Sequence, residues 1–212
     1  MTAAAWAVLI VAAVVAAADW VSVAATIRWL EYVTKPGFML ALIAFAIVIH
    51  PVNPAERTFF VVALAFGLVS DLFLMVPRDL FLWGLVAALV EHLVYISGFR
   101  TRELHIGHLL IAAAIGLASV AVIFPRIDSA LRREHRNLVA PVIAYLSVFV
   151  VMVASAGGTG SLVALAGALL FFYSDAILAW NRFVKPVPYG RVVNIVPYHV
   201  GQALLVFSLV AS

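Results

Sequence analysis

The chain has 212 residues, of which 66% are hydrophobic and only 11% are charged, and its formal net charge is +3. A soluble domain of this size is excluded, because its surface would expose enough apolar area to cause aggregation. Cysteine is absent, which excludes disulfide bonds and thiolate metal sites. Basic residues that anchor membrane helices explain the small positive charge, so no nucleic-acid partner is expected.

Eight apolar stretches are long enough to cross a bilayer as helices. They cover about residues 3–26, 37–52, 58–76, 80–99, 104–124, 137–156, 161–180 and 191–211. Long runs rich in Ala, Leu and Val favour helices over the short alternating strands of a membrane barrel. We therefore expect an all-α polytopic membrane bundle of about eight transmembrane helices, forming a single domain over residues 1–212.

Lys and Arg are unevenly divided between the two ends of the predicted helices. Ten of the thirteen fall in the connections after the first, third, fifth and seventh helices. Basic residues mark cytoplasmic loops, so we expect both termini outside, in an integral protein of a bacterial inner (plasma) membrane. The polar stretch 126–137, with four arginines, is expected to be a short surface helix or loop that anchors this topology.

Two Ser-Asp pairs lie inside apolar sequence, Ser70-Asp71 and Ser174-Asp175. Arg78 and Arg182 follow the aspartates seven residues later, so each carboxyl group lies about 10 Å inside a positively marked helix end. Acidic residues in a membrane span are costly and indicate a functional site. The matching depth of Asp71 and Asp175 predicts that they belong to one site. The two serines are expected to bond to the backbone or to pack, because neither lies in a nucleophile elbow.

The two halves of the chain look related. Pro36 and Pro141, each expected near the start of a helix, precede Asp71 and Asp175 at almost the same spacing. His92 and His199 then fall in the fourth and eighth helices. We interpret residues 1–100 and 101–212 as two parallel four-helix repeats, which would bring the aspartates together near the repeat axis.

These residues resemble the lysoplasmalogenase, or YhhN-type, family of integral membrane hydrolases over essentially the whole chain. The matching positions are Lys35-Pro36, Ser70-Asp71, Gly84, His92, Tyr95, Phe99, Pro141, Tyr145, Ser174-Asp175, Leu178-Ala179, Phe183, Tyr198 and Gln202. The stretch from Ser174 to Phe183 is the most specific. Glu91 and His199 depart from the family pattern, so any role for these two is inferred from this sequence alone.

The resemblance implies hydrolysis of the vinyl-ether bond of lysoplasmalogens, giving a fatty aldehyde and glycerophosphoethanolamine or glycerophosphocholine. Acid cleavage of a vinyl ether needs one protonated acid and one ionised carboxylate, which Asp71 and Asp175 would supply as the catalytic pair. No metal or cofactor is required. The expected partners are the lysophospholipid substrate and membrane lipids; a monomer and a homodimer are both compatible with the sequence.

Further polar residues are candidates for substrate binding. His92, Tyr95, Tyr198 and Gln202 share helix faces and are expected to line the cavity, with Glu91 and His199 as additional candidates. A basic rim, chiefly Lys35, Arg78, Arg182, Lys185 and Arg191, is expected to hold the lipid phosphate. Asp19 lacks a matching partner and is expected to make a structural hydrogen bond.

Two other classes of function stay open at this stage. A small transporter or lipid carrier would also use buried acids, but its helices are more often broken in mid-span, and here the prolines are expected at helix ends. A metal-dependent lysolipid hydrolase would use Asp71, His92, Asp175 and His199 as ligands, although no metal-binding spacing such as H-x-x-x-H is present.

Overall fold

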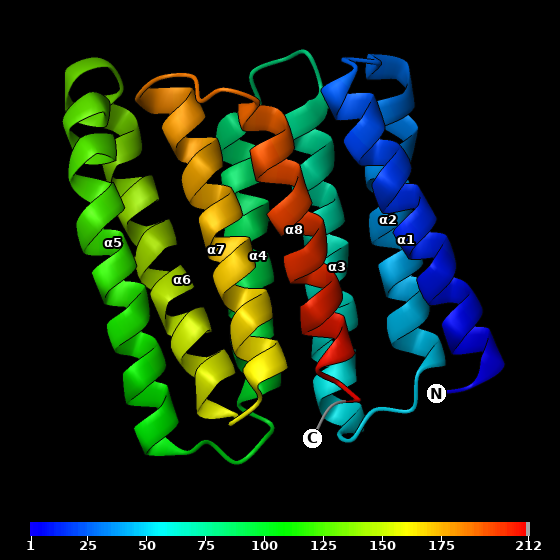
Figure 1. The fold of residues 1–212 in the computed structure, drawn as a ribbon. Helices are drawn as coiled ribbons and strands as arrows, with labels where there is room; N and C mark the ends of the chain where they lie inside the picture. The colour runs from blue at the N-terminus through cyan, green and yellow to red at the C-terminus, as the bar shows by residue number, and fades with distance from the viewer. Residues whose placement is uncertain (211–212) are drawn as a thin grey trace.

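The computed structural model describes residues 1–210, which form eight α-helices and one short 3-10 helix, with no strand in that range. The helices are α1 (Ala3–Ala24), α2 (Arg28–Val48), α3 (Pro54–Met75), α4 (Phe81–Phe99), α5 (Ile106–Glu134), η1 (Arg136–Leu138), α6 (Val139–Gly158), α7 (Leu162–Phe183) and α8 (Gly190–Phe207). They run along one common axis, and the first helix begins at the end where the last one finishes (Figure 1).

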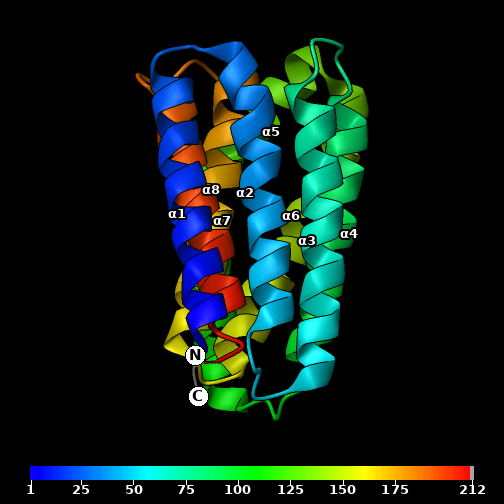
Figure 2. The ribbon, with the colours of Figure 1, turned by 90° about the vertical axis from the view of Figure 1, so that its right-hand side faces the viewer.

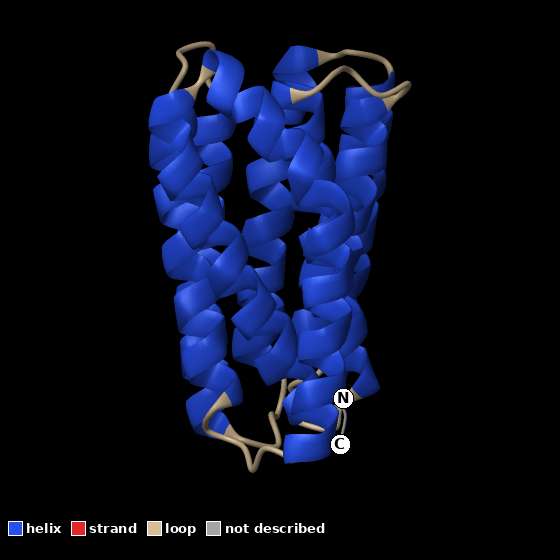
Figure 3. Cartoon of the chain, turned by 90° about the vertical axis from the view of Figure 1, so that its left-hand side faces the viewer, coloured by secondary structure: helices blue, strands red, loops and turns tan. Residues whose placement is uncertain are grey.

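Consecutive helices pair as antiparallel hairpins, α1 with α2, α3 with α4, α5 with α6, and α7 with α8. Helix α8 also packs on α1 and α2, and α4 packs on α6, so the four hairpins form one bundle (Figure 2). Short loops at both ends connect the helices (Figure 3). Phe45, Phe60, Phe99 and Phe149 are completely buried between them. This arrangement leaves the middle of the bundle available for a buried site.

The membrane class predicted from composition is confirmed. Seven helices, α1 to α7 with η1 counted with α6, are long and apolar enough to cross a bilayer. Helix α8 is not among them, because it carries polar residues such as Arg191, Asn194 and Gln202. The molecule is therefore an all-α membrane bundle in which α8 packs against α7, α1 and α2.

The predicted start of the second helix is wrong. Helix α2 begins at Arg28, and Pro36 lies in its interior rather than at its first turn. Pro125 in α5 and Pro197 in α8 are internal as well, so the expectation that prolines lie at helix ends fails at three positions. An interior proline removes one backbone hydrogen bond, but packed neighbouring helices compensate for this in membrane proteins. Each of the three helices continues through its proline.

The polar stretch 126–137 is not a separate surface helix or loop. Helix α5 continues through it as far as Glu134. Arg132 binds Asp128 one turn earlier at 2.7 Å, and the basic last turn complements the helix dipole. Ile127 and Leu131 are buried against α4, α6 and α7. Local charge pairing and one apolar face thus extend a helix that hydropathy alone would end earlier.

Candidate active site

A cavity of about 220 Å³ lies inside the bundle, and each of the eight α-helices contributes to its lining. Its apolar walls come mainly from α4 to α7 and include Phe81, Leu85, Phe124, Ile127, Val142, Leu146 and Phe183. Its polar lining consists of Arg28, Glu31, Lys35, Ser70, Asp71, Glu91, Tyr145, Ser174, Asp175, Arg191, Asn194 and Tyr198. Asp71 and Asp175 therefore face one cavity, as their matching depth predicted. A mostly apolar chamber with a few converging acids suits a lipid that is to be chemically altered.

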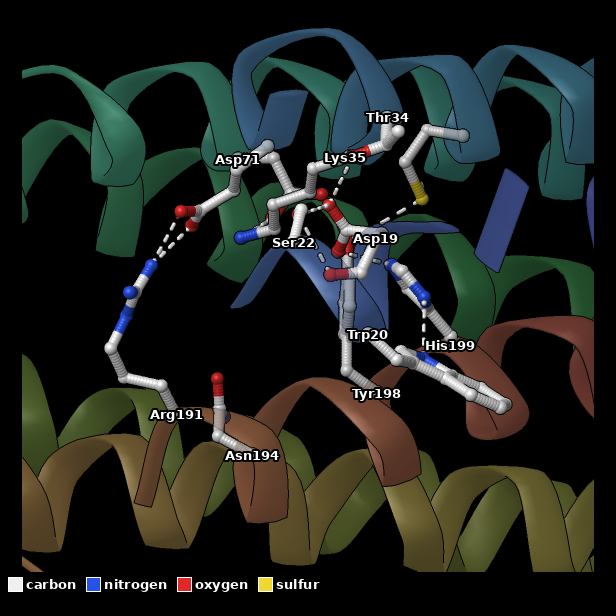
Figure 4. A network of polar contacts seen from close by, with 12 residues as sticks. Asp19, Trp20, Ser22, Thr34, Lys35, Asp71, Arg191, Asn194, Tyr198 and His199 are labelled. Atoms are coloured by element: carbon white, nitrogen blue, oxygen red, sulfur yellow. Dashed lines mark hydrogen bonds and ion pairs between the residues drawn. The ribbon is translucent and has the colours of Figure 1, made fainter. Parts of the chain in front are cut away.

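Asp71, near the end of α3, is held by two side chains from other helices. Lys35 Nζ of α2 lies 2.8 Å from Asp71 Oδ1, and the Tyr198 hydroxyl of α8 donates to Oδ2 at 2.7 Å (Figure 4). The Asp71 side chain is only 6% exposed. An adjacent ammonium group stabilises the charged form of a carboxyl group. Asp71 is thus the aspartate of the cavity that has a lysine as its ion-pair partner.

Asp175, on α7, has a different environment. The Tyr145 hydroxyl of α6 donates a hydrogen bond to Asp175 Oδ2. His92 Nε2 lies 3.0 Å from the same hydroxyl and 4.0 Å from Asp175. His92 Nε2 is therefore within hydrogen-bonding distance of the Tyr145 oxygen, and the tautomer of the histidine decides which of the two donates. Among residues 1–210, no Lys or Arg lies within ion-pair distance of Asp175.

A third buried carboxyl group, Glu91, lines the cavity ten residues into α4, about 15 Å from the start of that helix. Its Oε1 accepts a hydrogen bond from Gln202 Nε2 at 2.6 Å, and Gln202 Oε1 accepts one from the Tyr95 hydroxyl at 2.7 Å. Gly67 on α3 leaves the space that the Glu91 carboxyl group occupies. Glu91 thus lines the cavity, whereas Tyr95 and Gln202 lie outside the lining and hold Glu91 through a chain of two hydrogen bonds.

The two serines bond to the backbone, as predicted. Ser70 donates to the carbonyl oxygen of Gly84 on α4, and Ser174 donates to that of Asn194 on α8, both at 2.9 Å. The residue before each aspartate therefore ties its helix to the next one along the chain. This places Asp71 and Asp175 at fixed positions in the cavity wall.

His199 does not line the cavity. It is one residue beyond Tyr198, about 100° further round α8, and accepts a hydrogen bond from Trp20 on α1 at its Nδ1, 3.1 Å away. Its Nε2 lies 3.8 Å from Asp19 Oδ2, and both atoms are buried without a hydrogen-bond partner. Asp19 accepts a hydrogen bond from Thr34 at 2.5 Å, as expected of a structural residue. Figure 4 shows this second cluster beside the Asp71 cluster.

The basic rim differs from the prediction. Arg182 binds both carboxylate oxygens of Asp79 at 2.9 Å and lies over the Phe81 ring. Neither Arg182, Arg78 nor Lys185 lines the cavity. The Arg182 guanidinium holds the pKa of the exposed Asp79 carboxyl group, in the loop between α3 and α4, below its usual range. Lys35 lies deeper and is the counter-ion of Asp71.

Two charged residues in the lining, Arg28 and Glu31, were not predicted from the sequence. Arg191 Nη2 lies 2.6 and 2.5 Å from the two Glu31 oxygens, and Arg28 Nη1 lies 3.2 Å from Oε2. The spacing of Arg28, Glu31 and Lys35 places them on one helix face. This shared face was missed because the helix was expected to begin only after Pro36, whereas it begins at Arg28.

No group of three or more His, Cys, Asp or Glu side chains within residues 1–210 is placed to hold a metal ion. Of the four ligands considered for a metal-dependent hydrolase, His199 faces Asp19 and Trp20 rather than the cavity. The donor set required by that alternative is therefore not assembled in the described part of the chain.

The fold and the buried acids define a polytopic membrane protein with an internal, mostly apolar cavity. The model of the YhhN family matches residues 30–209, and the chain belongs to this family. It is 33% identical to lysoplasmalogenase TMEM86A of Homo sapiens, over 83% of this chain and 70% of that protein. It is 29% identical to lysoplasmalogenase TMEM86B of Mus musculus, over 85% and 75%. No solved structure matches the chain.

Proposed function

We propose that this protein hydrolyses the vinyl-ether bond of lysoplasmalogens inside the membrane. Its relatives are named lysoplasmalogenases and cover most of its length. The observation that carries the proposal is the joint presence of Asp71 and Asp175 in one apolar chamber, with Lys35 beside only the first of them. The chamber would accommodate the single hydrocarbon chain, and the two acids would supply the proton chemistry.

The two aspartates have distinct roles in this proposal. Asp175, which has no Lys or Arg partner among residues 1–210, is the proton donor. Asp71, paired with Lys35, is the carboxylate that stabilises the developing cation and orients water. The Tyr145 hydroxyl, supported by His92, directs the Asp175 carboxyl group. Tyr198 does the same for Asp71.

The reaction then takes three steps. Asp175 gives its proton to the vinyl carbon β to the ether oxygen, which leaves an oxocarbenium ion. Water adds to the oxocarbenium carbon and passes a proton to Asp71, which produces a hemiacetal. In the collapse of the hemiacetal, its hydroxyl proton returns to Asp175, the bond to the glycerol oxygen breaks, and that oxygen takes the proton from Asp71. The products are one aldehyde and one glycerophospho compound, and both acids regain their starting states.

The orientation in the membrane is part of the proposal. Arg28, Arg126, Arg132, Arg182 and Arg191 lie at the end of the bundle opposite the start of α1 (Figure 1). Assigning this end to the cytoplasm follows the preference of basic residues for that side. Both termini then lie outside, and the charged side of the cavity faces the inner leaflet, where the substrate would enter.

The proposed function is tested by product analysis of purified protein. Lysoplasmalogen is incubated without added metal, and mass spectrometry follows the fatty aldehyde and the head-group product. Equal amounts of both are expected with the native chain and none with Asp175→Asn. Lipid movement across proteoliposomes without any product would contradict the proposal and favour a lipid carrier. Loss of activity on treatment with a chelator would instead favour a metal-dependent hydrolase.

A further inference from the structure

The geometry points to a head-group site at the charged end of the cavity, formed by Arg28, Glu31 and Arg191. In this proposal the two guanidinium groups bind the phosphodiester of a single-chain lipid, and the Glu31 carboxylate binds its ammonium group. The inference rests on the proposed function for the identity of the lipid. It assigns a binding role to three residues, of which only Arg191 belonged to the predicted rim.

The three side chains form an alternating row of charges on the cavity wall. Glu31 is 9% exposed and sits between Arg28 and Arg191, which are 54% and 44% exposed. The side-chain hydrogen bonds within residues 1–210 use only Nη1 of Arg28 and Nη2 of Arg191. A guanidinium group has five N–H donors in a fork that matches phosphate. The arginines thus retain donors for an anionic ligand while a buried carboxylate holds them in place.

The arrangement of the charges, rather than their sum, favours a head group that carries both a phosphate and an ammonium group. Two cations around one carboxylate leave a net positive charge of one at the site, which suits a phosphodiester carrying a single negative charge. The Glu31 carboxylate would repel a second negative charge, because it lies within hydrogen-bonding distance of both arginines. An ammonium group bound to the lipid phosphate would instead gain a partner at Glu31.

The distance of the Arg28, Glu31 and Arg191 cluster from Asp71 suits a phosphate bound at one end of the lipid and a vinyl ether at the other. Lys35 follows Arg28 by seven residues on α2, and Tyr198 follows Arg191 by seven on α8. Each of these deeper residues therefore lies about 10 Å further into the bundle, and both contact Asp71. A phosphate at the arginines would place the glycerol backbone between the cluster and the acids, with the vinyl ether next to Asp71. The apolar walls beyond would contact the hydrocarbon chain.

A head-group site at Arg182 is the competing arrangement. Arg182 already binds both oxygens of Asp79, is stacked on Phe81 and does not line the cavity. A phosphate there would have to displace an existing bidentate partner. Single substitutions can distinguish between the two candidate head-group sites, because Arg182 and Arg191 belong to different helices and different ion pairs.

Binding is measured with saturated alkyl analogues, which lack the vinyl bond and so separate binding from turnover. Three probes differ only in head group: phosphoethanolamine, phosphate, and free glycerol. Arg191→Gln should raise the Kd for the phosphoethanolamine probe by about tenfold or more, as expected for a lost charged hydrogen bond, and leave the glycerol probe unchanged. Glu31→Gln should weaken binding of phosphoethanolamine and strengthen binding of phosphate.

Arg132→Gln is the matched control, since Arg132 forms an ion pair with Asp128 at the same end of the bundle, outside the cavity lining. It should leave all three Kd values unchanged. Arg28→Gln provides a second test if Arg191→Gln does not fold. The proposal is overturned if Arg191→Gln and Arg28→Gln bind phosphoethanolamine like the native chain, if Arg182→Gln alone weakens it, or if the glycerol probe weakens equally. Intact selectivity without vinyl-ether cleavage would refute the proposed function and leave this site standing.

Discussion

Lys35 Nζ lies 2.8 Å from Asp71 Oδ1, so the lysine that the sequence placed on a phosphate-binding rim is the counter-ion of a carboxylate inside the cavity. Its neighbour Thr34 donates to Asp19, and Tyr198, the other partner of Asp71, precedes His199, which faces Asp19. Asp19 and Asp71 are therefore connected through two pairs of neighbours in the sequence, Thr34 and Lys35 on α2 and Tyr198 and His199 on α8. The Asp19 cluster fixes the orientation of α2 and α8, from which Asp71 receives both partners.

Replacing Lys35 tests this relationship. Lys35→Met should lower kcat by about 100-fold or more, because removal of one preorganised charge from a catalytic site costs this much. Lys35→Arg keeps the positive charge and should retain a measurable part of the rate. Steady-state kinetics with lysoplasmalogen provides the measurement. If Lys35→Met changed KM alone, Lys35 would bind the head group and would not support Asp71.

The aspartates should act as a unit. Asp71→Asn and Asp175→Asn keep the shape of the side chain but cannot cycle a proton, so each should nearly abolish turnover while the protein stays folded. The double variant should be scarcely worse than either single one, since groups that act together are not additive. Circular dichroism and gel filtration serve as folding controls. Appreciable activity in either single variant would refute the paired mechanism.

Stability should depend on a buried ion pair at the end of the bundle opposite the charged side of the cavity. Arg102 donates to Glu56 at 2.7 Å and to the Ser208 carbonyl oxygen at 2.8 Å, and Glu56 is completely buried. Arg102→Met leaves an uncompensated carboxylate and should cost about 3–5 kcal/mol in the free energy of unfolding. Thermal unfolding in detergent measures the loss. The double variant with Glu56→Met should recover part of it; an equal or larger loss would contradict this account.

Acid should loosen the link between Asp79 and Arg182. The pKa of Asp79 is lowered by Arg182, so the pair stabilises the folded loop above the ordinary pKa of the carboxyl group, and this contribution disappears as the pH falls through the lowered value. Relative to the intrinsic amide rates, hydrogen exchange at residues 78–81 should therefore become faster at low pH. Asp79→Asn should show the faster exchange already at neutral pH. Equal exchange in both proteins at neutral pH would show that the pair does not hold the loop.

The amount of structure that could be predicted differs between the bundle and the site. Hydropathy and helix length are sufficient to detect the helices, although not the start of α2 or the end of α5. The Ser-Asp pairs indicate two walls of the cavity. The start of α2 was missed because proline at a helix start is common, whereas the tolerance of Pro36 depends on neighbouring helices. Missing that start concealed the shared face of Arg28, Glu31 and Lys35.

The direction in which an individual side chain points could not be predicted from the sequence either. His199 and Tyr198 are adjacent in sequence, yet one faces Trp20 and the other faces Asp71. Which of them lines the cavity depends on the rotation of α8 against α1 and α7, and no local pattern contains that angle. Trp20 illustrates the same point, since tryptophans of membrane helices are typically found at the interface, whereas Trp20 donates to the buried His199.

Oxygen isotope transfer shows directly whether water adds to the vinyl-ether carbon. The reaction is run with lysoplasmalogen in oxygen-18 water, and the aldehyde is reduced at once to prevent exchange with solvent. Label is expected in the alcohol derived from the aldehyde, and none is expected in the glycerophospho product. Label in the glycerol oxygen would mean cleavage of the glycerol–oxygen bond and would contradict the mechanism assigned to Asp71 and Asp175.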